Sequence, residues 1–134
     1  MSKYYKDIES YITALSSTIQ DTEKYLTEKL DKHADLLITD VKSRTPVDTG
    51  NLRDSWKRGI VNHAGNKYSV NIDNEAKNPD YRSEYATYVE FGHNSTAGNW
   101  VPGRFMLRTA QQNAIHNFEK DLKNDEVRLF SKLV

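Results

Sequence analysis

Apolar side chains recur with helical spacing through the first third of the chain. Isoleucine and leucine occur in steps of four, three and four residues, at Ile8, Ile12, Leu15 and Ile19. Such steps place side chains on one face of an α-helix. No glycine or proline interrupts residues 1–45. The pattern therefore predicts one long helix of about 35–40 residues, which at 1.5 Å per residue is on the order of 55 Å long.

A helix of this length exceeds what a small domain covers. We expect its C-terminal third, near residues 33–41, to pack on the rest of the protein, and its N-terminal part to be exposed or covered by a partner. The alternative is a helical hairpin that breaks near residues 16–17 or 21–22. We favour the single helix and an interface at its start, because the four exposed apolar residues would otherwise form a long apolar stripe.

A sharp corner follows the long helix at residues 45–56. Pro46 cannot continue a helix, because it lacks an N–H and its ring clashes with the preceding turn. The helix should therefore end near Arg44. Two good N-cap residues and a flexible glycine come next, namely Asp48, Thr49 and Gly50. A short helical turn through residues 51–53 should then bring Trp56 to the start of a strand.

The next segment predicts an antiparallel hairpin. Residues 56–62 and 67–73 are the two strands, and residues 63–66 are the turn. In the second strand the apolar residues alternate strictly with polar ones, at Tyr68, Val70 and Ile72. That alternation is typical of a half-buried strand with one face in water. Gly59 within the first strand indicates a bulge.

The last third of the chain predicts a short helix, a loop and a long helix. Residues 74–83 are a polar loop, and residues 84–93 read as a strand end and a short helix that Gly92 terminates. Residues 93–99 are small and polar, which is typical of a mobile loop. Amphipathic spacing then predicts a final helix from Arg104 to about Asn124, followed by a tail.

These elements define an α+β fold. It has a long N-terminal helix, a small antiparallel sheet built on a hairpin, and a C-terminal amphipathic helix packed on the sheet. At 134 residues the chain fits a single domain. We expect residues 1–44 to form the long helix, residues 45–124 the mixed α+β core, and residues 125–134 the tail.

Composition narrows the possible functions. The hydrophobic content of 37% and the mean hydropathy of −0.81 are low for a compact globule, which suggests either a helix that projects into solvent or apolar faces completed by another subunit. Nineteen basic and nineteen acidic residues balance, so the chain lacks the positive field that nucleic-acid binding usually needs. The absence of cysteine excludes disulfides and cysteine-ligated zinc and fits a cytoplasmic protein. We also expect no membrane span and no signal peptide.

Candidate chemistry is sparse. The four histidines lie far apart in sequence, without metal-ligand spacing, at His33, His63, His93 and His116. Glu84 and Glu90, with Asp80, could supply an acid–base pair, but no triad, phosphate loop or metalloprotease motif is present. Aromatic residues beside arginine could stack on bases, at Tyr81, Tyr85 and Tyr88 near Arg82 and at Trp100 near Arg104. Amphipathic core rings are the better interpretation, so we predict no enzyme, no metal and no cofactor.

Three short motifs, in order, resemble the signatures of a known family. The first, residues 45–55, contains Pro46, Asp48, Thr49, Gly50 and Leu52. The second, residues 85–92, is an aromatic run that ends with Tyr88, Glu90, Phe91 and Gly92. The third, residues 102–110, contains Pro102 and Phe105 at the start of the last helix. Together they are similar to the head–tail joining or tail-completion (minor tail) proteins of long-tailed bacteriophages, which also occur in defective prophages and phage-tail-like particles.

The resemblance covers about residues 36–124; the N-terminal helix is longer than the family pattern, and the resemblance assigns no role to residues 1–30. It implies a structural virion protein at the top of the tail, beside the terminator, the connector and the tube, often in a hexameric ring. It implies no membrane, no specific nucleic-acid binding, and assembly in the bacterial host cytoplasm.

The motif residues would then be scaffold, while contacts with neighbours would use other surfaces. The candidates are the apolar stripe (Ile8, Ile12, Leu15 and Ile19), the hairpin residue Arg58, and the loop residues Asn94 and Trp100. The alternative hypothesis is a dimeric helical adaptor or regulatory protein that associates through residues 5–40.

Overall fold

The computed structural model describes residues 8–47, 49–78, 84–95 and 97–133. Its helices are α1 (Ile8–Arg44), α2 (Asn51–Asp54), α3 (Ala86–Phe91), α4 (Met106–Leu129) and the 3-10 turn η1 (Ser131–Leu133). Its strands are β1 (Trp56–Arg58), β2 (Asn62–Ala64), β3 (Lys67–Ser69), β4 (Ile72–Asn74), β5 (Gly92–Asn94) and β6 (Trp100–Pro102). The predicted α+β class is confirmed.

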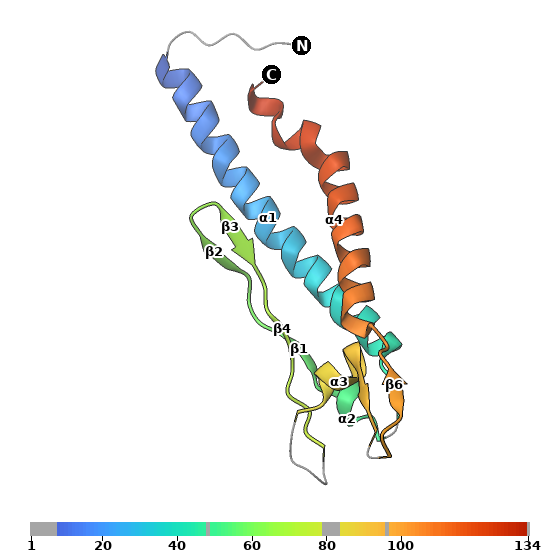
Figure 1. Ribbon diagram of the computed structural model, residues 1–134. Coiled ribbons are helices and arrows are strands. Elements are labelled where there is room, and N and C mark those ends of the chain that lie inside the picture. The colour runs from blue at the N-terminus through green and yellow to red at the C-terminus, as the bar shows by residue number, and fades with distance from the viewer. Residues whose placement is uncertain (1–7, 48, 79–83, 96, 134) are drawn as a thin grey trace.

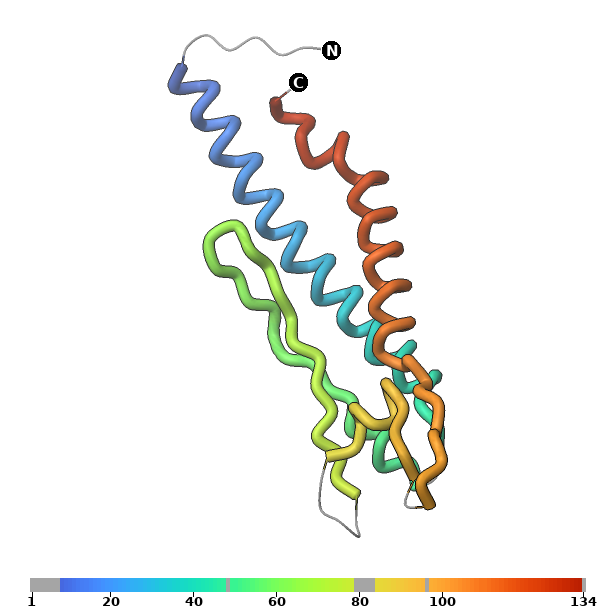
Figure 2. The backbone as a smooth tube through the Cα atoms, in the orientation of Figure 1, coloured from blue at the N-terminus to red at the C-terminus, as the bar shows by residue number. Residues whose placement is uncertain are grey.

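The molecule is elongated (Figure 1). The two long helices α1 and α4 lie side by side, and the hairpin of β1 to β4 runs along the other side of α1. The short elements α2, α3, β5 and β6 gather at one end. The backbone tube shows that the start of α1 and the end of α4 lie at the opposite end (Figure 2).

Helix α1 is continuous over 37 residues and ends at Arg44, as Pro46 predicts. The single-helix prediction is confirmed, and no break occurs at residues 16–17 or 21–22. Its buried residues lie mostly in the C-terminal half: Thr18, Tyr25, His33, Ala34, Leu37 and Val41. The expected packing of residues 33–41 on the rest of the protein is therefore confirmed.

The corner after α1 contains α2, the predicted short helical turn. Its N-cap residue is Gly50, which has a φ of 86° and offers no side-chain cap. The expectation that Thr49 would be the N-cap residue was therefore wrong. The Thr49 hydroxyl instead accepts the Asn51 N–H at 3.3 Å. Asp48 lies outside the described residues. A positive φ suits glycine, which explains why the turn pivots there.

A small core joins the corner to the start of α4. Its buried members are Leu37, Val41, Leu52, Trp56, Ala76, Met106 and Ala110. The Trp56 indole N–H donates to the Thr45 hydroxyl at 2.8 Å, and that hydroxyl donates to the Val41 carbonyl at 2.6 Å. Both polar groups are thus satisfied where water has no access.

The hairpin consists of two ladders in different register. Trp56 pairs with Asn74, and Arg58 pairs with Ile72. Beyond a gap, residues 62–64 pair with residues 67–69 around a turn in which Gly65 has φ 61°. Between the two ladders, residues 59–61 of the first strand lie opposite residues 70–71 of the second, so the first strand carries one extra residue. This is a bulge directly after Gly59, at the position the glycine indicated.

Residues 92–102 differ from the prediction, which made residues 93–99 a mobile loop. Strands β5 and β6 form a second hairpin instead. Backbone bonds close its turn, because the Ser95 N–H donates to the Asn99 carbonyl at 2.7 Å and the Gly98 N–H donates to Ser95 at 2.9 Å. Gly92 ends α3 with φ 89°, as predicted.

The last helix is longer than predicted. Helix α4 continues to Leu129 rather than Asn124, so the expected tail at residues 125–134 was wrong over its described part. Its main partner is α1, and only its first turns join the small core around Met106 and Ala110. The turn η1 docks back on α1, where Lys132 Nζ lies 2.9 Å from Asp21 Oδ2. Leu129 is also buried, and η1 therefore holds the end of α4 against the N-terminal half of α1.

Candidate interaction surfaces

The Glu90 side chain holds α3 against α4. It is 5% exposed, and its two carboxylate oxygens accept the Leu107 N–H at 2.9 and 3.0 Å. One of them also accepts the Arg108 N–H at 3.2 Å. Helix N-termini leave N–H groups without partners and favour negative charge. Glu90 therefore caps α4. Both of its carboxylate oxygens accept backbone N–H groups, so the geometry gives no support to an acid–base pair of Glu90 with the exposed Glu84.

Two glycines allow the backbone at the end of α3 to pass close to the backbone that precedes α4. A Cβ on Gly103 would lie 2.5 Å from the Glu90 carbonyl oxygen, and one on Gly92 would lie 2.7 Å from the Val101 oxygen. The Phe105 N–H donates to the Glu90 carbonyl at 3.0 Å. Gly103 is therefore part of the packed junction between α3 and the start of α4.

The three motifs meet in this part of the fold. Leu52 of the first motif is buried in the core that Met106 of the third motif also joins. The Asn51 amide donates to the Lys77 carbonyl at 3.3 Å and lies 3.5 Å from the Tyr85 hydroxyl of the second motif. Pro102 pairs with Gly92. These contacts favour a scaffold role for the motif residues that make them.

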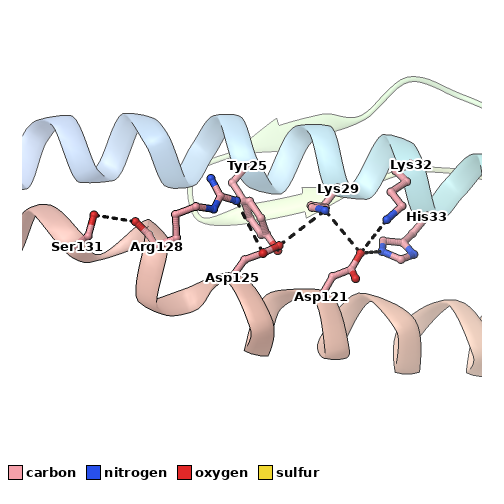
Figure 3. Close-up of polar contacts among 8 residues, drawn as sticks. All are labelled: Tyr25, Lys29, Lys32, His33, Asp121, Asp125, Arg128 and Ser131. Atoms are coloured by element: carbon pink, nitrogen blue, oxygen red, sulfur yellow. Dashed lines mark hydrogen bonds and ion pairs between the residues drawn. The ribbon is translucent and has the colours of Figure 1, made fainter.

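A layer of polar contacts joins α1 to α4 (Figure 3). The Tyr25 hydroxyl donates to Asp125 Oδ2 at 2.8 Å, and His33 Nε2 lies 2.8 Å from Asp121 Oδ2. Lys32 Nζ lies 3.1 Å from the same Asp121 oxygen. Lys29 Nζ lies between the two aspartates, 3.7 Å from each. This polar layer sets the register of the helix pair.

The same contacts shift two pKa values. The hydrogen bonds from His33 and Lys32 lower the pKa of Asp121 to about 2. Burial and the hydrogen bond to Asp125 raise the pKa of Tyr25 to about 12. Asp121 is thus ionised and accepts the His33 Nε2–H over the physiological range, while the Tyr25 hydroxyl keeps its proton.

Arg58 pairs within the chain. Its guanidinium lies 2.8 Å from Asp31 and 2.8 Å from Asp35, both on α1, and the side chain is 23% exposed. The arginine had been expected on the hairpin surface. In the structure Arg58 links β1 to α1 through these ion pairs, and little of its side chain is left exposed for a contact with another protein.

Exposed aromatic residues gather around α3, β5 and β6. We call this surface the tip patch: Tyr88, Phe91, Trp100 and Phe105, which are 55%, 60%, 62% and 39% exposed. The Phe91 and Phe105 rings meet edge to face at 6.4 Å, and the Arg108 guanidinium lies over the Phe105 ring. Asn94 is exposed beside them. The sequence pointed to Trp100 and Asn94 as contact residues but treated Tyr88, Phe91 and Phe105 as scaffold.

The predicted stripe on α1 is the second exposed apolar surface. Its residues Ile8, Ile12, Leu15 and Ile19 are 75%, 56%, 36% and 50% exposed. Below it lies an apolar groove of about 660 Å³ between α1, the hairpin and α4. Its lining is Leu26, Leu30, His33, Ala34, Leu37, Tyr68, Val70, Ile72, Gln111, Ala114, Ile115, Phe118, Glu119 and Leu122.

Other candidate sites receive no support from the geometry. Among the described residues, no three histidine, aspartate or glutamate side chains lie close enough to hold a metal ion. His63 stacks on Tyr68 at 4.0 Å, while His33 is engaged with Asp121. Asp80, Tyr81 and Arg82 lie outside the described residues. Over the described ranges, every helix is too short or too polar to span a membrane.

Comparison with known families identifies the class of protein. The model of the family described as "Bacteriophage HK97-gp10, putative tail-component" matches residues 6–92. Because this match covers more than half of the chain, the protein belongs to the HK97-gp10-like family of phage tail components. Comparisons with curated proteins and with solved structures gave no match.

The family places the chain in the tail of a virion, where other tail proteins are its partners. The family is not known for enzymatic activity. The matched range includes α1 from its first turn, so the whole long helix belongs to the family region, whereas the sequence resemblance began at about residue 36. The third motif lies beyond the matched range.

Proposed function

We propose that the protein is a tail-completion or head–tail joining component that acts by protein–protein assembly at the top of the tail. Its neighbours there would be the terminator, the connector and the tube. Copies would form a ring, for which the resemblance implies six. Assembly would take place in the cytoplasm of the bacterial host.

One observation carries this proposal: two exposed apolar surfaces lie at opposite ends of an elongated molecule. The stripe is on the N-terminal half of α1, and the tip patch surrounds α3. Exposed apolar patches of this kind mark interaction sites. A subunit inside an assembly needs contacts on more than one side, and unlike patches that meet head to tail close into rings when the rotation permits.

Mass spectrometry of purified particles tests the role. Particles that contain the other tail-top proteins should contain this chain, and a strain with Trp100→Asp and Phe91→Asp should assemble particles that lack it. The double variant Ile60→Asp with Val127→Asp is the matched control, because these two exposed residues lie outside both surfaces and outside the groove. Particles that hold the other tail-top proteins without this chain would refute the proposal.

The uncovered stripe also favours the second candidate, an adaptor that dimerises through residues 5–40. Deletion of residues 1–16 removes no side chain that is buried among the described residues, since Thr18 is the first buried position. If the protein is an adaptor, the truncated chain should be a folded monomer and should lose its partner, while particles should form without the protein.

A further inference from the structure

The groove between α1, the hairpin and α4 has a closed floor and an accessible apolar rim. The floor residues His33, Ala34 and Leu37 are already buried within the chain and offer no surface to a partner. Above them, apolar side chains from all three walls keep part of their surface accessible, among them Leu26, Leu30, Tyr68, Ile115, Phe118 and Leu122. The rim, and not the floor, is therefore the surface on which another molecule can pack.

The tip patch has the side chains that such a groove accommodates. Its most exposed members are Trp100 and Phe91, and aromatic anchors at interfaces insert into apolar pockets. The tip patch cannot enter the groove of its own copy. Phe105 directly precedes α4, and Ile115 lies ten residues further along, about 15 Å away on the same rigid helix. A tip that fills this groove must belong to a second copy.

Charge favours the tip patch as the occupant. Apart from His33, Glu119 is the one formally charged side chain among the described residues that line the groove. The tip patch has two exposed arginines beside Phe105, namely Arg104 and Arg108, and the Arg108 guanidinium lies 5.6 Å from the Phe105 ring centroid. A docked tip would give the Glu119 carboxylate an opposite charge instead of leaving it unpaired. The stripe offers no such cation, because residues 10–20 carry no charge.

We infer that the tip patch of one copy docks on the groove rim of the next copy, with Arg108 beside Glu119. A contact between two unlike surfaces is heterologous and closes into a ring when the rotation permits. It is the repeating contact of the ring proposed above, on which it rests. The stripe is left uncovered by this contact and remains available to a neighbouring tail protein.

The size of the contact fits a ring better than a free dimer. With four rings that are roughly half exposed, and about 150–250 Å² of surface on each aromatic side chain, the tip patch would bury roughly 300–500 Å². A stable pair buries about 800 Å² on each partner. In a ring every copy makes two such contacts, one through its tip and one through its groove. The contact should therefore be weak between two free chains and persistent in the assembled ring.

Cross-linking tests the contact, because the chain has no native cysteine. Asn94→Cys marks the tip without removing an aromatic side chain, since Asn94 pairs with Trp100 across the β5–β6 hairpin. Ile115→Cys marks the groove rim. The two variants carry different tags and are mixed at high concentration with a short bis-maleimide. We expect the mixed product in several-fold excess over the product of either variant alone, because a heterologous contact brings neither two tips nor two grooves together.

Charge reversal gives a second readout on the same reaction. Arg108→Glu in the tip chain, or Glu119→Arg in the groove chain, should lower the yield of mixed product several-fold. The two reversals together should restore the yield, which a loss of folding in either chain would not allow. Lys24→Glu is the control, since Lys24 lies outside both surfaces. Circular dichroism checks that each variant is folded.

Three results would overturn the contact. They are equal yields from the mixed and the single-variant samples, a larger yield from Ile12→Cys with Ile115→Cys, which would place the stripe in the groove, and no rescue by the double reversal. The same reaction on purified particles that contain both cysteine variants separates this contact from the tail role. Particles that contain the chain but give no tip-to-groove product would overturn the contact and leave the tail role. Absence of the chain from particles that hold the other tail-top proteins would refute the tail role, while a mixed product from free chains would still support the contact.

Discussion

Both carboxylate oxygens of Glu90 accept the backbone N–H of Leu107, at 2.9 and 3.0 Å. The N-cap position of α4 is Phe105, which has no side-chain oxygen and a φ of 49°. A 24-residue helix thus begins without a local cap, and a side chain from α3 supplies the missing acceptor. The stability of α4 depends on α3 for this reason.

Glu90→Gln should destabilise the protein by about 1–3 kcal/mol, because the cap loses its charge and an amide N–H₂ then faces the α4 N–H groups. Urea denaturation measures the free energy of unfolding. The control is Glu84→Gln, an exposed carboxylate that should change stability by less than about 0.5 kcal/mol. Equal effects of the two substitutions would contradict the capping role.

Gly103→Ala should cost at least about 1–3 kcal/mol, because the new methyl group would lie 2.5 Å from the Glu90 carbonyl oxygen and force α3 from α4. Thermal unfolding followed by circular dichroism tests this. Gly59→Ala is the matched control, since its Cβ would lie 4.0 Å from the nearest heavy atom, an ordinary contact. A melting temperature unchanged in Gly103→Ala would mean that the junction is looser than the structure indicates.

Thr45→Val should cost about 1–3 kcal/mol, since it leaves the buried Trp56 indole N–H without an acceptor. Thr45→Ser keeps the hydroxyl and should restore most of this loss. The free energy of unfolding of both variants decides the matter, and Trp56 fluorescence reports whether the ring stays buried. If valine and serine were equally stable, the hydrogen bond would contribute little.

Acid should weaken the α1–α4 pair through Asp121. Its pKa falls from the ordinary 3.8 to about 2 in the folded protein. A lowered carboxyl pKa contributes stability that is complete above the unfolded value and is lost as the pH falls through the folded value. The loss should therefore occur between about pH 4 and pH 2.

Asp121→Asn should flatten this part of the pH profile, measured as the free energy of unfolding at intervals from pH 2 to pH 7. Asp73→Asn, at an exposed position on β4, serves as the control. A variant that keeps the full wild-type slope below pH 4 would show that other carboxyl groups cause the acid loss.

The sequence predicted the elements that local signals define. Helix α1 was predictable because an unbroken apolar period is followed by Pro46, and the hairpin because Tyr68, Val70 and Ile72 alternate with polar residues. The bulge was predictable from Gly59. Each of these sequence signals lies within a few residues of the structural feature that it determines.

Contacts between segments that are distant in the sequence were harder to predict. The cap by Glu90 links residues 17 apart through backbone N–H groups, which leave no side-chain pattern to read. The polar layer did leave a trace, since Asp121 and Asp125 are one helical turn apart, as are Lys29 and His33. The extension of α4 to Leu129 follows from this pairing, because α1 gives the last turns a surface on which to pack.

The pairing of the first and last helices has a consequence for biosynthesis. Tyr25 and its partner Asp125 are 100 residues apart. A ribosome adds about 5–20 residues per second, so the first helix leaves the exit tunnel about 5–20 s before its partner helix exists. Throughout that interval the nascent chain presents an amphipathic helix without its cover. Slow translation prolongs this exposure, and chaperones that bind apolar segments have the same interval in which to act.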